Sequence, residues 1–247
     1  MSLRTNTMRS QAGFTLVELA IVMIIIGLLI GGVLKGQELI GNAQTTATVA
    51  QVKAMEAATS TFRDTYASLP GDILTPATRL PNCTTGACAT AGNGNGRLDN
   101  LTSATPIGAE GERFFLHLNA ASLLTGIVPG ASGVLTNFPS TKISGSVIQA
   151  GNAAAVADLA GAVDNTGAST GLYLTIINAV GVPSTATVGL KPSEALRIDT
   201  KLDDGVPGGG VVRAIGTAAA CGTTGDAGTY MTNLNAAGCG LYIKVQS

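Results

Sequence analysis

Few residues in this chain of 247 have the types and spacing that chemistry requires. Glu18 is the one charged residue in an otherwise apolar stretch, residues 14–34. A carboxylate inside a bilayer costs about 3 kcal/mol unless it is paired, so Glu18 is a candidate functional residue. The plain alternative places Glu18 near the lipid headgroups, where its carboxylate stays hydrated.

The single histidine, His117, stands among apolar residues in the stretch EGERFFLHLNAASLL. A catalytic histidine needs a nucleophile or an acid partner, and no such arrangement surrounds it. The sequence also lacks a Gly-x-Ser-x-Gly elbow, a His-Glu-x-x-His motif and a phosphate-binding loop. We therefore expect a packed structural side chain at His117 and no enzymatic activity.

Two polar segments carry oxygen ligands of the kind that calcium prefers. They contain Asn93, Asn95 and Asp99 in AGNGNGRLDN, and Asp199, Asp203 and Asp204 in a later turn. The second cluster is the better candidate metal site, because calcium favours charged oxygens. Asn-Gly repeats are more often plain turns, so we expect no cofactor, with calcium as the alternative.

The first element that must position these residues is a long apolar helix. Residues 14–34 contain no Pro, and a helix of this length rises about 31 Å, enough to cross the hydrocarbon core of a bilayer. The leader, residues 1–13, contains Arg4 and Arg9 and no acidic residue. Basic flanks stay in the cytoplasm, so the body of the chain is expected to face outward. Met1 and Met8 are both candidate start residues.

The basic leader and the apolar span flank the hexapeptide Gly13-Phe14-Thr15-Leu16-Val17-Glu18. This hexapeptide resembles the cleavage and methylation signature of type IV prepilins and pseudopilins. The resemblance implies that a prepilin peptidase cuts between Gly13 and Phe14 and methylates the new N-terminal Phe14. It also implies that Glu18 pairs with the N-terminal amine of a neighbouring subunit during assembly.

Four cysteines follow the span: Cys83, Cys88, Cys221 and Cys239. On the exported, oxidising side of a membrane an even number of cysteines predicts disulfides. Three pairings exist, and we favour the local one, Cys83–Cys88 with Cys221–Cys239. Zinc is disfavoured, because the C-x4-C spacing is loose and His117 is distant from both pairs in the sequence.

The helix signal continues beyond the span until Pro70-Gly71 stops it, so one helix is predicted over residues 14–68. Apolar residues at a spacing of three or four predict its buried face, namely Ile40, Ala43, Ala47, Ala50, Ala54, Ala58, Phe62 and Tyr66. Within the span, Gly27–Gly31 and Gly32–Gly36 form two GxxxG pairs. These pairs either allow close helix packing or merely loosen the span.

The predicted fold class is α+β and pilin-like: a long N-terminal helix with a membrane-spanning first half, packed on an antiparallel sheet head. The expected domains are a leader (1–13), a transmembrane and assembly helix (14–36), its amphipathic continuation (37–69) and a globular head (70–247). Within the head, helices are predicted over 110–124 and 192–202. Strands are predicted over 142–149, 171–179, 210–215 and 240–245.

Lys and Arg number 14 against 15 Asp and Glu, so no basic surface for nucleic acid is expected. The resemblance favours a structural subunit of a type IV pilus or a type II secretion pseudopilus, which polymerises through its N-terminal helix. The alternative is a minor pilin at the filament tip that acts as an adhesin or a substrate-binding module.

The resemblance also implies partners and a location. The expected partners are further copies of the chain, other pilins, the prepilin peptidase, the inner-membrane assembly platform and the membrane itself. The expected location is the inner membrane, crossed once with the head in the periplasm, and then a pilus or pseudopilus at the cell surface. The sequence leaves open which filament this is, and whether the subunit is major or minor.

Overall fold

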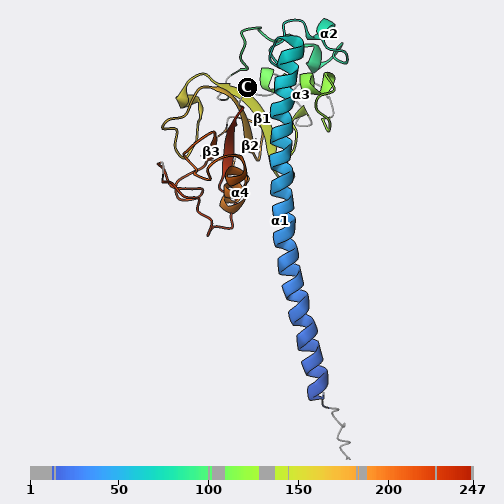
Figure 1. Cartoon of the computed structure of the whole chain (residues 1–247), viewed down its shortest axis with the longest axis vertical. Helices are drawn as coiled ribbons and strands as arrows, with labels where there is room; N and C mark the ends of the chain where they lie inside the picture. The colour runs from blue at the N-terminus through green and yellow to red at the C-terminus, as the bar shows by residue number, and fades with distance from the viewer. Residues whose placement is uncertain are drawn as a thin grey trace, which may run out of the picture. The chain divides into compact units, whose positions relative to one another are not determined.

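A computed structural model describes residues 13, 15–99, 101, 109–127, 137–143, 145–181, 183, 188–225 and 227–245 (Figure 1). The chain divides into two compact units, residues 1–42 and 43–247, and the boundary falls within the first helix. Arg4, Arg9 and Phe14 lie outside the described residues, as do both candidate start methionines.

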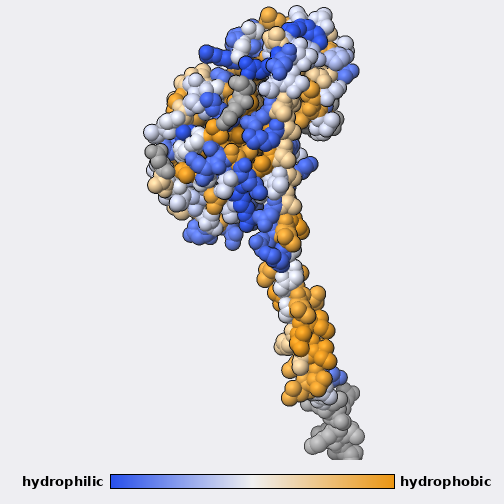
Figure 2. Space-filling view, viewed as in Figure 1, coloured by the Kyte–Doolittle hydropathy of each residue, from blue (hydrophilic) through white to orange (hydrophobic). Residues whose placement is uncertain are grey.

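Helix α1 (Leu16–Tyr66) is 51 residues long, and a helix of that length rises about 77 Å. It confirms the long N-terminal helix, and it ends at a turn where Ala67 has a φ of 49°. Among the described residues it is the helix that is long and apolar enough to cross a membrane. Its side chains from residue 16 to 34 are exposed, and Figure 2 shows them as a hydrophobic surface.

The second half of α1 buries a different face from the predicted one. Its buried residues are Thr45, Thr48, Val52, Met55, Ala58, Thr59 and Phe62. Residues 40, 43, 47, 50 and 54, which the spacing assigned to the core, are exposed, whereas Ala58 and Phe62 are buried as predicted. Threonines can lie on this buried face because their hydroxyls are hydrogen-bonded within the helix. Thr48 donates to the carbonyl oxygen of Gln44, and Thr59 donates to that of Met55.

Four antiparallel strands form one sheet in the order β1-β2-β4-β3, which confirms the predicted antiparallel head. The strands are β1 (Val147–Ala153), β2 (Gly171–Ile177), β3 (Val212–Ile215) and β4 (Gly240–Lys244). Successive side chains along a strand point to opposite faces of the sheet, so neighbouring residues of one strand belong to different hydrophobic clusters. Leu174 and Ile243 belong to the main core with Phe62 of α1, whereas Tyr173 and Tyr242 belong to a smaller second core.

Short helices complete the head: α2 (Pro76–Arg79), η1 (Ala87–Ala89), α3 (Glu110–Ala120), η3 (Val156–Asp158) and α4 (Pro192–Leu202). The bounds of α4 are the predicted ones. Helix α3 ends at Ala120 rather than at residue 124, because the chain turns at Ser122, whose φ is 59°.

The prediction for β1 was displaced toward the N-terminus. Thr141 and Ser146 lie outside β1, and the backbone N–H of Thr141 donates to the carbonyl oxygen of Ser146, 2.9 Å away. The strand instead continues through Gly151 and Asn152, residue types that usually indicate a turn. Gly151 fits in the strand because the side chain of Leu101 occupies the space beside it. A side-chain carbon of Leu101 lies 2.8 Å from the position that a Cβ of residue 151 would take.

Helix α3 approaches β1 closely, and the approach depends on Gly111. A Cβ at this position would overlap the carbonyl oxygen of Ala150 in β1. Gly111 is therefore required by packing and not by backbone conformation.

We expect Gly111→Ala to lower the free energy of unfolding by about 1–3 kcal/mol, because the added methyl must displace α3 or the strand. The measurement is urea unfolding of the full chain in detergent, followed by circular dichroism. Gly36→Ala is the matched control, since a Cβ there meets no atom within 4 Å. An equal loss in both variants would contradict the close-contact explanation.

Candidate functional site

The first turn of α1 is built by Thr15 and Glu18 together. The Oε2 atom of Glu18 accepts hydrogen bonds from the backbone N–H and the hydroxyl of Thr15, at 2.9 and 2.8 Å. In return, the backbone N–H of Glu18 donates to the hydroxyl oxygen of Thr15 at 3.2 Å. This reciprocal arrangement is a capping box, which satisfies N–H groups that the helix itself leaves unpaired.

The carboxylate of Glu18 has no cationic partner within the described chain. The ion pairs there join Lys35 to Glu38 and Lys53 to Glu56. Glu18 itself is exposed, and among the described residues the hydrogen bonds of its carboxylate come from Thr15. Its negative charge is therefore available to a positive group from outside the chain.

Five glycines near the N-terminus make no close packing contact with the described residues. A Cβ at Gly13 would meet nothing within 4 Å, and the same holds for Gly27, Gly31, Gly32 and Gly36 in α1. The fold therefore does not select Gly13. A requirement outside the folded chain, such as processing or helix association, accounts better for these residues.

Comparison with known proteins assigns this region. A family model described as the prokaryotic N-terminal methylation motif matches residues 8–34, which include Gly13, Phe14 and Glu18. This motif is the signature of type IV prepilins and pseudopilins, and the chain carries it over these residues. No curated protein and no solved structure matches the chain. Pilins of this family are structural proteins, and the motif with its apolar helix fits a pilin anchored in the inner membrane.

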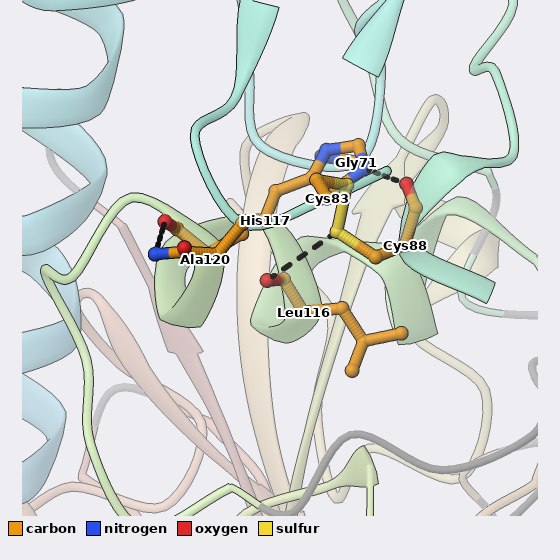
Figure 3. The surroundings of a disulfide bond; sticks show 7 residues. Gly71, Cys83, Cys88, Leu116, His117 and Ala120 are labelled. Carbon is orange, nitrogen blue, oxygen red and sulfur yellow. Dashed lines mark hydrogen bonds between the residues drawn. A yellow bond between two sulfur atoms is a disulfide. The ribbon is translucent and has the colours of Figure 1, made fainter. Parts of the chain in front are cut away.

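The cysteines of this pilin-like head form the two local disulfides, Cys83–Cys88 and Cys221–Cys239. The first disulfide lies beside His117, which the sequence alone did not connect to it (Figure 3). Side-chain ligand atoms of Cys83, Cys88 and His117 lie within 4.8 Å of one another. Because both sulfurs are in the disulfide, they offer no thiolate to a metal ion.

His117 joins three segments of the head, as Figure 3 shows. Its Nδ1 accepts a hydrogen bond from the backbone N–H of Gly71 at 2.8 Å, so Nε2 carries the proton and donates to the carbonyl oxygen of Cys88 at 3.0 Å. Burial lowers the pKa of His117 to about 4, so the ring is neutral at pH 7. The prediction of a packed, structural histidine is confirmed by its complete burial.

The structure brings Asp199, Asp203 and Asp204 together, with carboxylate oxygens within 4.8 Å of one another. Burial, and then the charges of Asp204 and Asp203, raise the pKa of Asp199 to about 7 against the hydrogen bond from Tyr230. Backbone N–H groups at Gly205, Val206, Val211 and Val212 donate to these carboxylates. Hydrogen bonds from its own turn, and from the backbone at the start of β3, thus hold the cluster.

The other predicted cluster is built around a buried aspartate that the sequence did not single out. Backbone N–H groups of Gly94, Asn95 and Gly96 donate to the carboxylate of Asp72, at 2.6, 3.2 and 2.6 Å. The side-chain oxygens of Asn93 and Asn95 accept backbone N–H groups two residues onward. The GNGNG segment therefore forms consecutive turns whose amides surround a carboxylate.

Sequence reasoning missed Thr15, Asp72 and Arg213. The pattern Thr-x-x-Glu before an apolar run was a readable signal for Thr15. Asp72 stands in a turn, LPGD, whose aspartate carries no sign of burial in the sequence. Arg213 is 4% exposed and donates to the carbonyl oxygens of Asp164, Thr166 and Gly208, and no local pattern predicts this.

The pKa of His117 is lower in the folded chain than in the unfolded chain, so the free energy of unfolding depends on pH. The unfolded chain takes up a proton near pH 6.5, whereas the folded chain does so only near pH 4. The contribution of His117 to stability is therefore complete above about pH 6.5 and is lost as the pH falls toward 4.

We expect the difference in unfolding free energy between wild type and His117→Gln to shrink by roughly 2 kcal/mol between pH 7 and 4.5. All other titrating groups cancel in this comparison, because both proteins contain them. The measurement is denaturant unfolding at several pH values. A difference that stays constant across this range would show that the ring takes up its proton equally in both states.

Proposed function

We propose that the chain is a structural subunit that polymerises through α1 into a type IV pilus or a type II secretion pseudopilus. The observation that carries this proposal is Glu18, an exposed and unpaired carboxylate at the start of an exposed apolar helix. The matched methylation motif supports it, because that motif contains both Glu18 and the expected cleavage point between Gly13 and Phe14.

Charge recognition at Glu18 would set the register between subunits. A peptidase that cuts after Gly13 leaves a new amine on Phe14, and Glu18 of a neighbour is the acceptor that the apolar segment offers. A buried ion pair is nearly neutral overall, but leaving one partner unpaired costs about 3–5 kcal/mol. Registers that fail to pair Glu18 are thus disfavoured.

Apolar packing would supply most of the stability of the filament. The large aliphatic residues of the first half of α1 are exposed, Leu16 and Leu28 by 85% and 73%. The exposed alanines at 43, 47, 50 and 54 give the second half of α1 a further uncovered face of small residues. Small residues, like the GxxxG glycines, let helices approach closely.

The proposal includes the cellular setting. The subunit would wait in the inner membrane with its head in the periplasm, where the two disulfides form. A prepilin peptidase would process it, and an inner-membrane assembly platform would add it to other pilins. The filament then extends to the cell surface, and no nucleic acid is required.

Glu18→Gln tests the central step. Glutamine can keep the capping box with Thr15, since either residue serves at that position, but it removes the charge. We expect normal expression, insertion and cleavage, with the ratio of sheared-filament to membrane-bound protein reduced at least tenfold, in line with the cost of an unpaired partner. Quantitative mass spectrometry of sheared filaments measures this ratio.

Thr15→Val is the matched control, because it removes the capping hydroxyl and keeps the carboxylate of Glu18. We expect this variant to enter filaments better than Glu18→Gln. If both variants lose incorporation equally, the helix cap and not the charge governs assembly. If Glu18→Gln keeps the wild-type ratio, the proposed function is wrong at its physical core.

A further inference from the structure

Two Asn-Gly sequences, Asn93-Gly94 and Asn95-Gly96, follow one another in the head, and the chain contains no others. All four residues are exposed. An Asn-Gly sequence is chemically labile, because glycine has no side chain to hinder attack of its backbone nitrogen on Cγ of the preceding asparagine. The new C–N bond closes a succinimide ring and releases the side-chain amide as ammonia. Water then opens the ring to aspartate or isoaspartate.

The loop requires glycine at both of these positions. Gly94 has a φ of 70° and Gly96 a φ of 80°, in the left-handed region that other residues rarely adopt. A Cβ at Gly94 would also lie 2.7 Å from the side chain of Leu74. Replacing either glycine would therefore strain the loop, so protection from the reaction must come from the groups around it.

One buried carboxylate, that of Asp72, holds both of the nitrogens that would attack. The backbone N–H of Gly94 donates to Oδ1 and that of Gly96 donates to Oδ2, each at 2.6 Å. Asp72 is 2% exposed, so pulling either nitrogen away costs a hydrogen bond of a buried charged group. The attacking nitrogen must also lose its proton, and a negative nitrogen beside this carboxylate is electrostatically disfavoured.

The side chains that would be attacked are held as well. Oδ1 of Asn93 accepts the backbone N–H of Asn95 at 3.0 Å, and Oδ1 of Asn95 accepts that of Arg97 at 2.8 Å. Each carboxamide is thus bound to the amide two residues onward, as in other turns of this kind. Rotating either carboxamide away from this position breaks a hydrogen bond. Both reacting groups of each Asn-Gly sequence are therefore restrained by the fold.

We propose that Asn93 and Asn95 are the deamidation sites of the chain, and that Asp72 suppresses their reaction while the head is folded. Isoaspartate at either position would add a methylene to the backbone and move the following amides out of register with Asp72. The loop also joins α3, since the backbone N–H of Asn93 donates to Oε1 of Glu110 at 2.8 Å. The reaction would therefore loosen the head, and it is independent of filament assembly.

The test is incubation of the full chain in detergent at mildly alkaline pH, followed by peptide mapping that separates asparagine, aspartate and isoaspartate at residues 93 and 95. We expect the folded wild type to react at least about tenfold more slowly than the same chain in denaturant, in line with the strength of a hydrogen bond to a charged group. Asp72→Asn keeps the size of the side chain and removes its charge, and it should raise the rate at least about fivefold. Equal rates in the folded and denatured wild type overturn the proposal, as does a wild-type rate in Asp72→Asn.

Glu110→Gln is the matched control. It weakens the hold on the same loop through the amide of Asn93, whose nitrogen attacks neither asparagine. We expect this variant to deamidate at the wild-type rate. An equal rise in Glu110→Gln and Asp72→Asn would show that opening of the loop, and not the carboxylate on the attacking amides, governs the reaction, and would overturn the role of Asp72.

Hydrogen exchange of the wild-type amides decides the matter if Asp72→Asn fails to fold. Base-catalysed exchange removes the same proton that the attacking nitrogen must lose. The N–H groups of Gly94 and Gly96 should exchange more slowly than that of Arg97, which donates to the neutral carboxamide of Asn95. Exchange at Gly94 and Gly96 that is as fast as at Arg97 would overturn the proposal.

Discussion

The first half of α1 depends on apolar burial that the chain itself does not provide. Its aliphatic side chains are exposed from residue 16 to 34, and burying each one fully contributes about 1.5–3 kcal/mol. Such a segment must lie in lipid or among other helices. The matched motif, the contact-free glycines and the unpaired carboxylate all lie on this same segment. Each of these features fits a segment that lies in lipid or among other helices, and Glu18 is the group that is costly to bury in either environment.

The capping box between Thr15 and Glu18 lowers the cost of placing the Glu18 carboxylate in an apolar environment. Before any partner arrives, Oε2 of Glu18 already accepts two hydrogen bonds from Thr15, so the carboxylate is partly satisfied by its own helix. The positive end of the helix dipole also favours an anion in the first turn. The first turn of its own helix therefore holds Glu18 in place. In the proposed assembly this fixed position would reduce the entropy lost when the carboxylate pairs with a neighbour.

The sequence predicted those helices and strands that residues within or next to the element determine. Pro192 near the start of α4 and the alternating apolar residues of β2 and β4 gave bounds close to the observed ones. The buried face of α1 was missed because Thr48 and Thr59 become suitable for a core only through hydrogen bonds within the helix. The extension of β1 was missed because Gly151 serves the packing of Leu101, a contact distant in sequence. For the same reason the burial of Asp72, Glu110 and His117 could not be read from their neighbours.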